Sequence, residues 1–221
     1  MKNFWIPGIL GMTLISCGGN APAAAPPPVA PPAAEAPAPA EEPALEKGTV
    51  TSAESGKIIA DFESIGKLNN VGGAYDMWAS EAPKGMASVE VVPEGEGTGS
   101  ALKITYDISR REGSNGAYSG IWMNLEGFDA STSKNLVMSV KAANGAGPKF
   151  FVELKCGENN KFVARAEARN IGSAWTKIEI PLVEFKEITD WKKLTQMAIV
   201  FDQNISSVAK GAYFIDNIRF E

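Results

Sequence analysis

Alternation of apolar and polar residues is the clearest pattern in the second half of the chain. Residues 136–141 read LVMSVK and residues 162–169 read FVARAEAR, so every second side chain is of one kind. Successive side chains of a β-strand point to opposite faces, which gives this period of two. The pattern therefore predicts strands that bury one face and expose the other.

Ten short runs with strand-like composition lie between residues 57 and 220, and Gly, Pro and Asn fill the gaps between them. Many short strands separated by turns predict an all-β, two-sheet sandwich. Only residues 182–194 leave room for a turn or two of helix. The predicted strands are Lys57–Glu63, Met86–Val92, Ala101–Asp107, Ser119–Leu125, Asn135–Ala142, Lys149–Cys156, Lys161–Arg169, Trp175–Pro181, Gln196–Asp202 and Tyr213–Phe220.

The N-terminus has the features of a targeting segment. An apolar run over residues 4–15 follows Lys2 and is too short to span a bilayer. It ends in Leu14-Ile15-Ser16-Cys17, which resembles the lipobox of bacterial lipoproteins. The resemblance implies a signal peptide over residues 1–16 and an acylated Cys17. Because Gly18 rather than Asp follows, it also favours the outer membrane. The alternative is an ordinary signal peptide or an uncleaved anchor.

Residues 17–49 form a linker between this segment and the predicted domain, residues 50–221. Within it, residues 21–45 contain 11 alanines and 9 prolines. So much proline blocks helix and sheet hydrogen bonding, so we expect a disordered, extended spacer. At full extension it would reach about 75 Å and could hold a domain away from a membrane.

Charge and composition exclude several functions. The net charge is −5 and the basic residues are scattered, so nothing indicates nucleic-acid binding. The chain has no histidine, which removes the commonest general base and most zinc sites. Once Cys17 carries lipid, Cys156 has no disulfide partner, and we interpret it as a small buried side chain.

Six motifs between residues 57 and 221 resemble one family when they are taken in order. Together they resemble the galactose-binding-like jelly rolls of bacterial carbohydrate-binding modules, most closely family 11. They are also similar to the complex I intermediate-associated protein family, which has the same fold. The motifs are DFES at 61–64, NNVGG at 69–73 followed by Trp78, SALKITY at 100–106, YSGI at 118–121, WTKIEIPL at 175–182 and FIDNIRF at 214–220.

The resemblance implies a jelly roll with a sugar-binding concave face, no catalytic activity of its own and often a structural calcium ion. Family 11 modules usually accompany endoglucanases and bind β-glucan chains. We expect no catalytic domain in this chain, so the resemblance implies binding rather than hydrolysis.

Three carboxylates are candidate calcium ligands. Asp61 and Glu63 flank Phe62 in the first predicted strand. Asp216 is an even number of positions from the apolar Phe214, Ile218 and Phe220, so in a regular strand it would point to the same side as they do. By resemblance, the first and last strands lie close together, which would bring the three carboxylates to one point. Such a group suits calcium, which prefers oxygen ligands. The alternative is that Asp61 and Glu63 are solvated and that Asp216 accepts backbone N–H bonds.

Aromatic residues near loops are candidate sugar contacts, because sugars stack their C–H faces on aromatic rings. We expect Tyr75 and Trp78 to lie in a Gly-rich loop and Tyr118 to follow another, and Trp122 lies in the next predicted strand. Packing is the alternative for all four residues. Of the other two tryptophans in the predicted domain, we expect Trp175 to lie in the core and Trp191 to be a packing residue.

Polar residues on the strands add candidate ligand contacts. Glu153 and Arg165 alternate with apolar residues on neighbouring predicted strands, and Asp202 and Gln203 follow a third. These four side chains could bond sugar hydroxyls on the floor of a cleft. The alternative is a solvated face with cross-strand ion pairs.

The first hypothesis for function is a non-catalytic, membrane-anchored lipoprotein that binds β-glucan, another polysaccharide or a cell-wall glycan. The second is an envelope assembly or structural factor that uses the same face for a protein partner. A third, hydrolysis by paired carboxylates such as Glu153 and Glu167, lacks support because the sequence does not set their separation.

Overall fold

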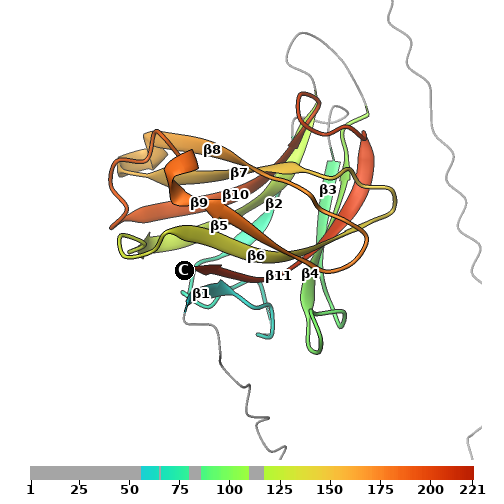
Figure 1. Ribbon diagram of the computed structural model, residues 1–221, viewed down its shortest axis with the longest axis horizontal. Coiled ribbons are helices and arrows are strands. Elements are labelled where there is room, and N and C mark those ends of the chain that lie inside the picture. The colour runs from blue at the N-terminus through green and yellow to red at the C-terminus, as the bar shows by residue number, and fades with distance from the viewer. Residues whose placement is uncertain (1–55, 65, 80–85, 110–116) are drawn as a thin grey trace, which may run out of the picture. The chain divides into compact units, whose positions relative to one another are not determined.

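The computed structural model describes residues 56–221, except residue 65 and residues 80–85 and 110–116 (Figure 1). The predictions for residues 1–49, including the lipid on Cys17, lie outside these residues. The strands are β1 Lys57–Ala60, β2 Tyr75–Ala79, β3 Met86–Val92, β4 Ala101–Asp107, β5 Tyr118–Phe128, β6 Asn135–Ala143, β7 Phe150–Cys156, β8 Phe162–Ala168, β9 Thr176–Pro181, β10 Leu194–Asp202 and β11 Lys210–Phe220. Two 3-10 turns, η1 Glu158–Asn160 and η2 Leu182–Glu184, complete the elements.

The strands form two antiparallel sheets in two layers (Figure 1). The first sheet has the order β3-β4-β11-β6-β9, and β1 pairs with the C-terminal part of β11. The second sheet has the order β2-β5-β10-β7-β8. Consecutive strands are thus often not neighbours, as expected of a jelly roll. The predicted all-β sandwich is confirmed.

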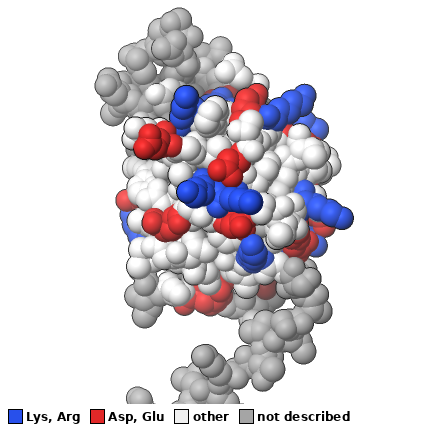
Figure 2. Space-filling model, turned by 90° about the vertical axis from the view of Figure 1, so that its left-hand side faces the viewer, with Lys and Arg blue, Asp and Glu red and all other residues white. Residues whose placement is uncertain are grey.

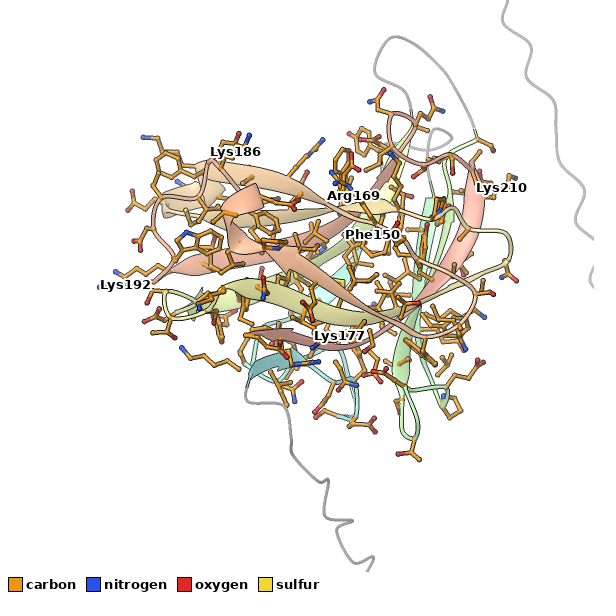
Figure 3. All side chains as sticks on the ribbon, in the orientation of Figure 1. Phe150, Arg169, Lys177, Lys186, Lys192 and Lys210 are labelled. Carbon is orange, nitrogen blue, oxygen red and sulfur yellow. The ribbon has the colours of Figure 1, made fainter. Side chains whose placement is uncertain are left out.

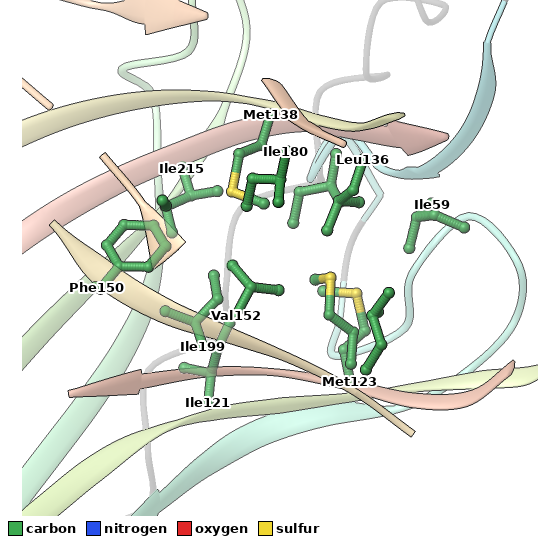
Figure 4. Packing of buried hydrophobic residues seen from close by; sticks show 14 of the residues in the cluster. Ile59, Ile121, Met123, Leu136, Met138, Phe150, Val152, Ile180, Ile199 and Ile215 are labelled. Atoms are coloured by element: carbon green, nitrogen blue, oxygen red, sulfur yellow. The ribbon is translucent and has the colours of Figure 1, made fainter. Parts of the chain in front are cut away.

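Side chains from the inner faces of the two sheets form one core (Figure 4). Met138 and Ile180 of the first sheet meet Ile121 and Ile199 of the second, and all four are buried. Removal of this apolar surface from water is the main source of stability. The alternation in residues 162–169 is confirmed, since Ala164, Ala166 and Ala168 are buried and face the core and the residues between them are exposed or half-buried. In residues 136–141 the expected exposed face was wrong: Leu136, Met138 and Val140 face the core, but Val137 and Ser139 on the other face are buried as well.

A bulge in β11 overturns the expected position of Asp216. Tyr213 and Ile215 face the core, so Asp216 lies on the outer face of the first sheet. The register then shifts between Asp216 and Arg219, where Asn217 has a left-handed φ of 51°. The extra residue restores Ile218 to the core. The prediction that Asp216 shares a face with the core residues beyond it was wrong, because the extra residue of a bulge reverses which positions face the core.

The segment around Tyr75 is an edge strand rather than a loop. β2 pairs with β5 along its whole length, which sends alternate side chains to opposite faces. Tyr75 points into the core, where its ring packs edge-on against Phe62 at 5.8 Å between centroids. Phe62 enters the core as expected, although β1 already ends at Ala60. The prediction of a loop over Tyr75 and Trp78 was wrong.

The helical content of the described residues is limited to the two short 3-10 turns. None of the helices in this part of the chain has the length and apolar character needed to cross a membrane.

Candidate functional site

The outer face of the second sheet, here called the open face, brings residues from five strands into rows. Ala198 on the central strand β10 pairs with Trp122 of β5 on one side and Glu153 of β7 on the other. Glu153 in turn pairs with Arg165 of β8. Because directly paired residues point the same way, these four side chains form one row across the sheet.

A second row lies two residues further along β10, on the same face of the sheet. Here Val200 pairs with Gly120 and Phe151, and Gly120 pairs with Trp78 of β2. A Cβ atom on Gly120 would lie 2.0 Å from the Ile199 carbonyl oxygen and 3.3 Å from Trp78 Nε1. Only glycine fits at this position, and its lack of a side chain lets the Trp78 indole lie across the strand.

Aromatic side chains form one wall of a groove on the open face. Trp78 and Trp122 line the groove, whose volume is about 490 Å³, and the small Ala198 lies between its walls. Trp78 also contacts Tyr118, with 5.3 Å between ring centroids and a tilt of 48°. Tyr118 is 37% exposed. The wall therefore presents ring surface that a ligand can reach.

A chain of hydrogen bonds forms the other part of the groove. Lys155 Nζ donates to Gln196 Oε1 at 2.8 Å, and Gln196 Nε2 donates to Asn124 Oδ1 at 3.3 Å. The three residues come from β7, β10 and β5 and line the groove together. Asn124 and Gln196 were not predicted from the sequence, whereas Lys155 alternates with apolar residues on the same predicted strand as Glu153. Each of the three lies an even number of positions from a predicted site residue of its own strand and so points to the same face. The strand order that brings the three together is not visible in the sequence.

An ion pair next to the groove holds a buried carboxylate. Glu153 is 5% exposed, and its Oε1 accepts hydrogen bonds from Arg165, with Nη2 at 2.6 Å. Lys155 Nζ lies 3.8 Å from Glu153 Oε2, and Arg165 Nη1 lies 3.9 Å from Asp202 Oδ2. A buried carboxylate requires such partners. Glu153 is therefore part of a network rather than a solvated member of a surface pair.

The structure brings most of the predicted ligand contacts together but not all of them. Tyr75 is a correction: it is 3% exposed, and its hydroxyl donates to the Gly66 carbonyl oxygen at 3.2 Å. Gln203 lies beyond β10 and uses Nε2 to donate to the Ile108 carbonyl oxygen at 2.9 Å. The residues that share the open face are Trp78, Tyr118, Trp122, Glu153, Arg165 and Asp202.

A larger groove of about 750 Å³ lies between the β5–β6 connection and the segment after β9. Its half-buried aromatic residue, Trp191, packs edge-on against the buried Phe185 at 6.4 Å, as expected for a packing residue. Figure 2 shows basic and acidic side chains interspersed on one side of the molecule. Because Phe185 is buried and Trp191 packs on it, this groove presents less aromatic surface than the groove on the open face, where both tryptophans are half-buried.

The outer face of the first sheet, here called the covered face, carries the predicted calcium ligands Glu63 and Asp216. Backbone N–H groups of the connection between β3 and β4 donate hydrogen bonds to both carboxylates. The Glu96 N–H donates to Asp216 Oδ2 at 2.9 Å and the Ser100 N–H donates to Glu63 Oε1 at 2.7 Å. Burial, the largest cause, and the nearby Glu63 and Glu96 carboxylates raise the pKa of Asp216, and the N–H bonds lower it, so that the net pKa is about 6.

Asp61 does not join the other two carboxylates. Its Oδ2 accepts a hydrogen bond from Asn70 Nδ2 at 2.8 Å, and its Oδ1 accepts the Glu63 N–H at 3.2 Å. Among the residues that the structure describes, the acidic side chains form no group of three or more that could hold a metal ion as they stand. The calcium site at Asp61, Glu63 and Asp216 stays a prediction.

Solved structures that share this fold include carbohydrate-binding modules. The family 11 module of the cellulosomal cellulase Lic26A-Cel5E of Clostridium thermocellum has a TM-score of 0.58 and 19% identity, over 76% of this chain and 95% of that one. The Clostridium thermocellum module in complex with a β-1,3-1,4-mixed-linked tetrasaccharide has the same score and identity, over 76% and 96%. A solution structure of the module CtCBM11 has a TM-score of 0.55 at 19% identity, over 77% and 96%.

These likenesses confirm that the chain has the fold of family 11 carbohydrate-binding modules, as the motifs indicated. The sequence matches no protein-family profile and no curated protein. At this level of identity the likeness extends to the fold alone, and the function has to be argued from the open face.

Proposed function

We propose that this protein binds a polysaccharide, without catalysis, through the groove on the open face. The observation that carries the proposal is the composition of this groove. Trp78 and Trp122 form an aromatic wall, and Asn124, Gln196 and Lys155 form a connected polar row beside it.

The chemistry of a pyranose fits this arrangement. Its C–H face is apolar and stacks on aromatic rings, whereas its hydroxyls need donors and acceptors around the edge. The polar row is already hydrogen-bonded, so its groups are held in place before a ligand arrives. Preorganised side chains lose little conformational entropy on binding, which favours affinity.

β-Glucan is the first ligand to test. The similar module of Clostridium thermocellum is described in complex with a β-1,3-1,4-mixed-linked tetrasaccharide. In this chain the groove is flanked by carboxylates that already have cationic partners, with Glu153 bonded to Arg165. Such a paired set of charges suits a neutral sugar chain and supports the same ligand class.

Attachment to the bacterial outer membrane through a lipid on Cys17 is part of the proposal. Its support is the Leu-Ile-Ser-Cys motif at residues 14–17 and the Ala- and Pro-rich linker that follows. A spacer of about 75 Å would present the groove to polysaccharide away from the membrane. Mass spectrometry of the purified N-terminal peptide tests it, since acylation adds a defined mass to Cys17.

A structural calcium ion is proposed for the covered face, with a ligand set different from the predicted one. Glu63, Glu96 and Asp216 lie near enough for the first two to raise the pKa of the third. Their oxygens are the ligands that calcium prefers. Asp61 is left out because it is not among the carboxylates that raise the pKa of Asp216, and its own oxygens accept hydrogen bonds from Asn70 and the Glu63 N–H. The ion would offset the repulsion among the three carboxylates.

A pull-down with insoluble polysaccharides tests the main proposal. The chain carrying Cys17→Ser is incubated with mixed-linked β-glucan, cellulose, xylan and peptidoglycan, and bound protein is measured. We expect retention on at least one of them and its loss in the double variant Trp78→Ala/Trp122→Ala.

The alternative is a protein partner that binds the same face, which would assign the chain an assembly or structural role in the envelope. No retention on any polysaccharide, together with a co-purifying protein that Trp122→Ala releases, would support this alternative and overturn the main proposal.

A further inference from the structure

A second groove, of about 330 Å³, lies on the open face beside the first. It extends from Phe151 on β7 past Arg165 on β8 to Lys186, in the connection after η2. Figure 3 shows Lys186 and Lys192 on the same side of the molecule, but only Lys186 lines the groove.

The Glu153–Arg165 ion pair lies where the two grooves meet. Glu153 lines the first groove and Arg165 lines the second. The two residues are direct cross-strand neighbours, and Arg165 Nη2 lies 2.6 Å from Glu153 Oε1. The grooves therefore adjoin along a line that crosses β5, β10, β7 and β8. With Trp78 on β2 included, the line spans five strands, or about 19 Å at the usual strand spacing.

The second groove has the same two kinds of surface as the first. The Phe151 ring is half-buried, and the guanidinium of Arg165 lies 5.7 Å from its centroid. Arg165 Nε and Nη2 are directed to Glu153, whereas Nη1 lies 3.9 Å from Asp202 Oδ2, beyond hydrogen-bond length. The Nη1 hydrogens can therefore reach a ligand that stacks on this surface. The Arg165 side chain is half-exposed, so solvent reaches it from the groove.

The two arginines of the second groove are paired with carboxylates. Arg169 Nε donates to Glu167 Oε2 at 2.9 Å, and Arg165 is neutralised by Glu153. A carboxylated sugar would gain little from the two arginines, because each already has an acidic partner. The remaining charged residues of the lining, Lys186 and Glu184, are one of each sign. The groove thus has the character of a site for neutral sugars.

We infer that the second groove continues the binding site, so that the ligand is a chain of neutral sugars lying across the Glu153–Arg165 pair. The inference rests on the proposed function and deepens it. It assigns Phe151, Arg165 and Lys186 to the far end of the site. It also requires a ligand longer than one that fills the first groove alone, which a polysaccharide chain provides.

The dependence of affinity on chain length tests this inference. Oligosaccharides of four and six units are prepared from the polysaccharide retained in the pull-down, with mixed-linked β-1,3-1,4-glucan as the first probe. Their dissociation constants for the Cys17→Ser chain are measured by isothermal titration calorimetry. We expect the hexasaccharide to bind about tenfold more tightly, since the second groove adds an aromatic contact and hydrogen bonds.

Two variants address the second groove separately. Lys186→Ala removes its outer edge, and Phe151→Leu removes the ring while keeping an apolar side chain on β7. Both variants should lower the affinity for the hexasaccharide to the value for the tetrasaccharide. The affinity for the tetrasaccharide should stay unchanged. Lys192→Ala is the matched control, because this exposed lysine of the same connection lines neither groove. A thermal melt of each variant confirms that it is folded.

Two results would overturn the inference while the proposed function stands. One is equal affinity of the unaltered chain for both lengths. The other is equal weakening of both lengths by Lys186→Ala and by Phe151→Leu in folded protein. A chain that binds neither length and none of the polysaccharides overturns the proposed function and this inference together.

Discussion

The two outer faces of the sandwich are built from the same kind of alternating strands but differ in what lies on them. On the open face, Trp78 and Trp122 are half-buried and line a groove. On the covered face, Phe214 is 6% exposed and forms a small cluster with Val92 and Ala101. An aromatic residue on the outside of a strand can therefore be a binding surface or a packing residue.

Its neighbours decide between the two roles. Lys141 Nζ lies 4.2 Å from the centroid of the Phe214 ring and 5.3 Å from that of Trp175, so cationic side chains shield these rings. The β3–β4 connection bonds to Asp216 on the same face. On the open face, Gly120 and Ala198 leave space beside the tryptophans instead.

The largest difference between the faces should appear on removal of one aromatic side chain from each. Trp122→Ala should weaken polysaccharide binding thirtyfold or more, about the 2 kcal/mol typical of an anchoring residue, with little change in thermal stability. Phe214→Ala should retain the affinity and lose about 3 kcal/mol of unfolding free energy, because it empties a buried site. Calorimetric titration and denaturant unfolding measure the two quantities. Unchanged affinity in Trp122→Ala would remove the distinction.

The buried carboxylate of the covered face should make stability depend on pH. The pKa of Asp216, about 6 when folded, lies above its ordinary value of 3.8, so the folded protein binds this proton more tightly than the unfolded chain. The stabilisation is complete below about pH 4 and is lost as the pH rises through 6. The loss is about 3 kcal/mol.

Denaturant unfolding between pH 4 and pH 7, in a chelating buffer, measures this loss. The difference between the unaltered chain and Asp216→Asn isolates it from other titrating groups. Parallel pH profiles for the two proteins would show that Asp216 titrates normally.

Calcium should stabilise the covered face and leave the open face unaffected. At a hundredfold excess over its dissociation constant, one bound ion adds about 2.7 kcal/mol to the free energy of unfolding. Melts in calcium and in EDTA measure the shift. Glu63→Gln should abolish it, and Asp61→Asn should retain it, because the Asp61 carboxylate is bonded to Asn70. Loss of the shift in Asp61→Asn would favour the ligand set predicted from the sequence.

The smallest expected effects distinguish the roles of two residues on strand β2, Tyr75 and Trp78. Tyr75→Phe removes the hydrogen bond to the Gly66 carbonyl oxygen and should cost about 1 kcal/mol of stability without changing affinity. Trp78→Phe, three residues along β2, should lower the affinity and leave the stability nearly unchanged. A binding defect in Tyr75→Phe would return this residue to the ligand site.

Local patterns predicted much of the fold. The alternation in residues 162–169 and the turn residues between runs were sufficient for an all-β sandwich, because a strand that buries one face has an apolar residue at every second position. The edge strand β2 was missed, because its five residues follow a Gly-rich stretch that is equally typical of a loop. Tyr75 was consequently assigned to the ligand site when it belongs to the core.

The candidate site could be predicted only in part. Trp122, Glu153 and Arg165 were identified by residue type, and the register places them in one row. Asn124 and Gln196 were not identified, since amides are common on strands and only their pairing joins them to Lys155. The ion pair that buries Glu153 was likewise visible only as two separate charged residues.

By itself, the sequence determined that the chain forms β-strands with one apolar face, because the period of two is a local property of the backbone. It also supplied the aromatic, amide and charged residues that a sugar site needs. The tertiary structure decided which outer face stays open, since the strand order, the fold of the β3–β4 connection and the bulge at Asn217 depend on residues far apart in the chain. A bulge of one residue moves Asp216 out of the core, and alternation cannot record such a step.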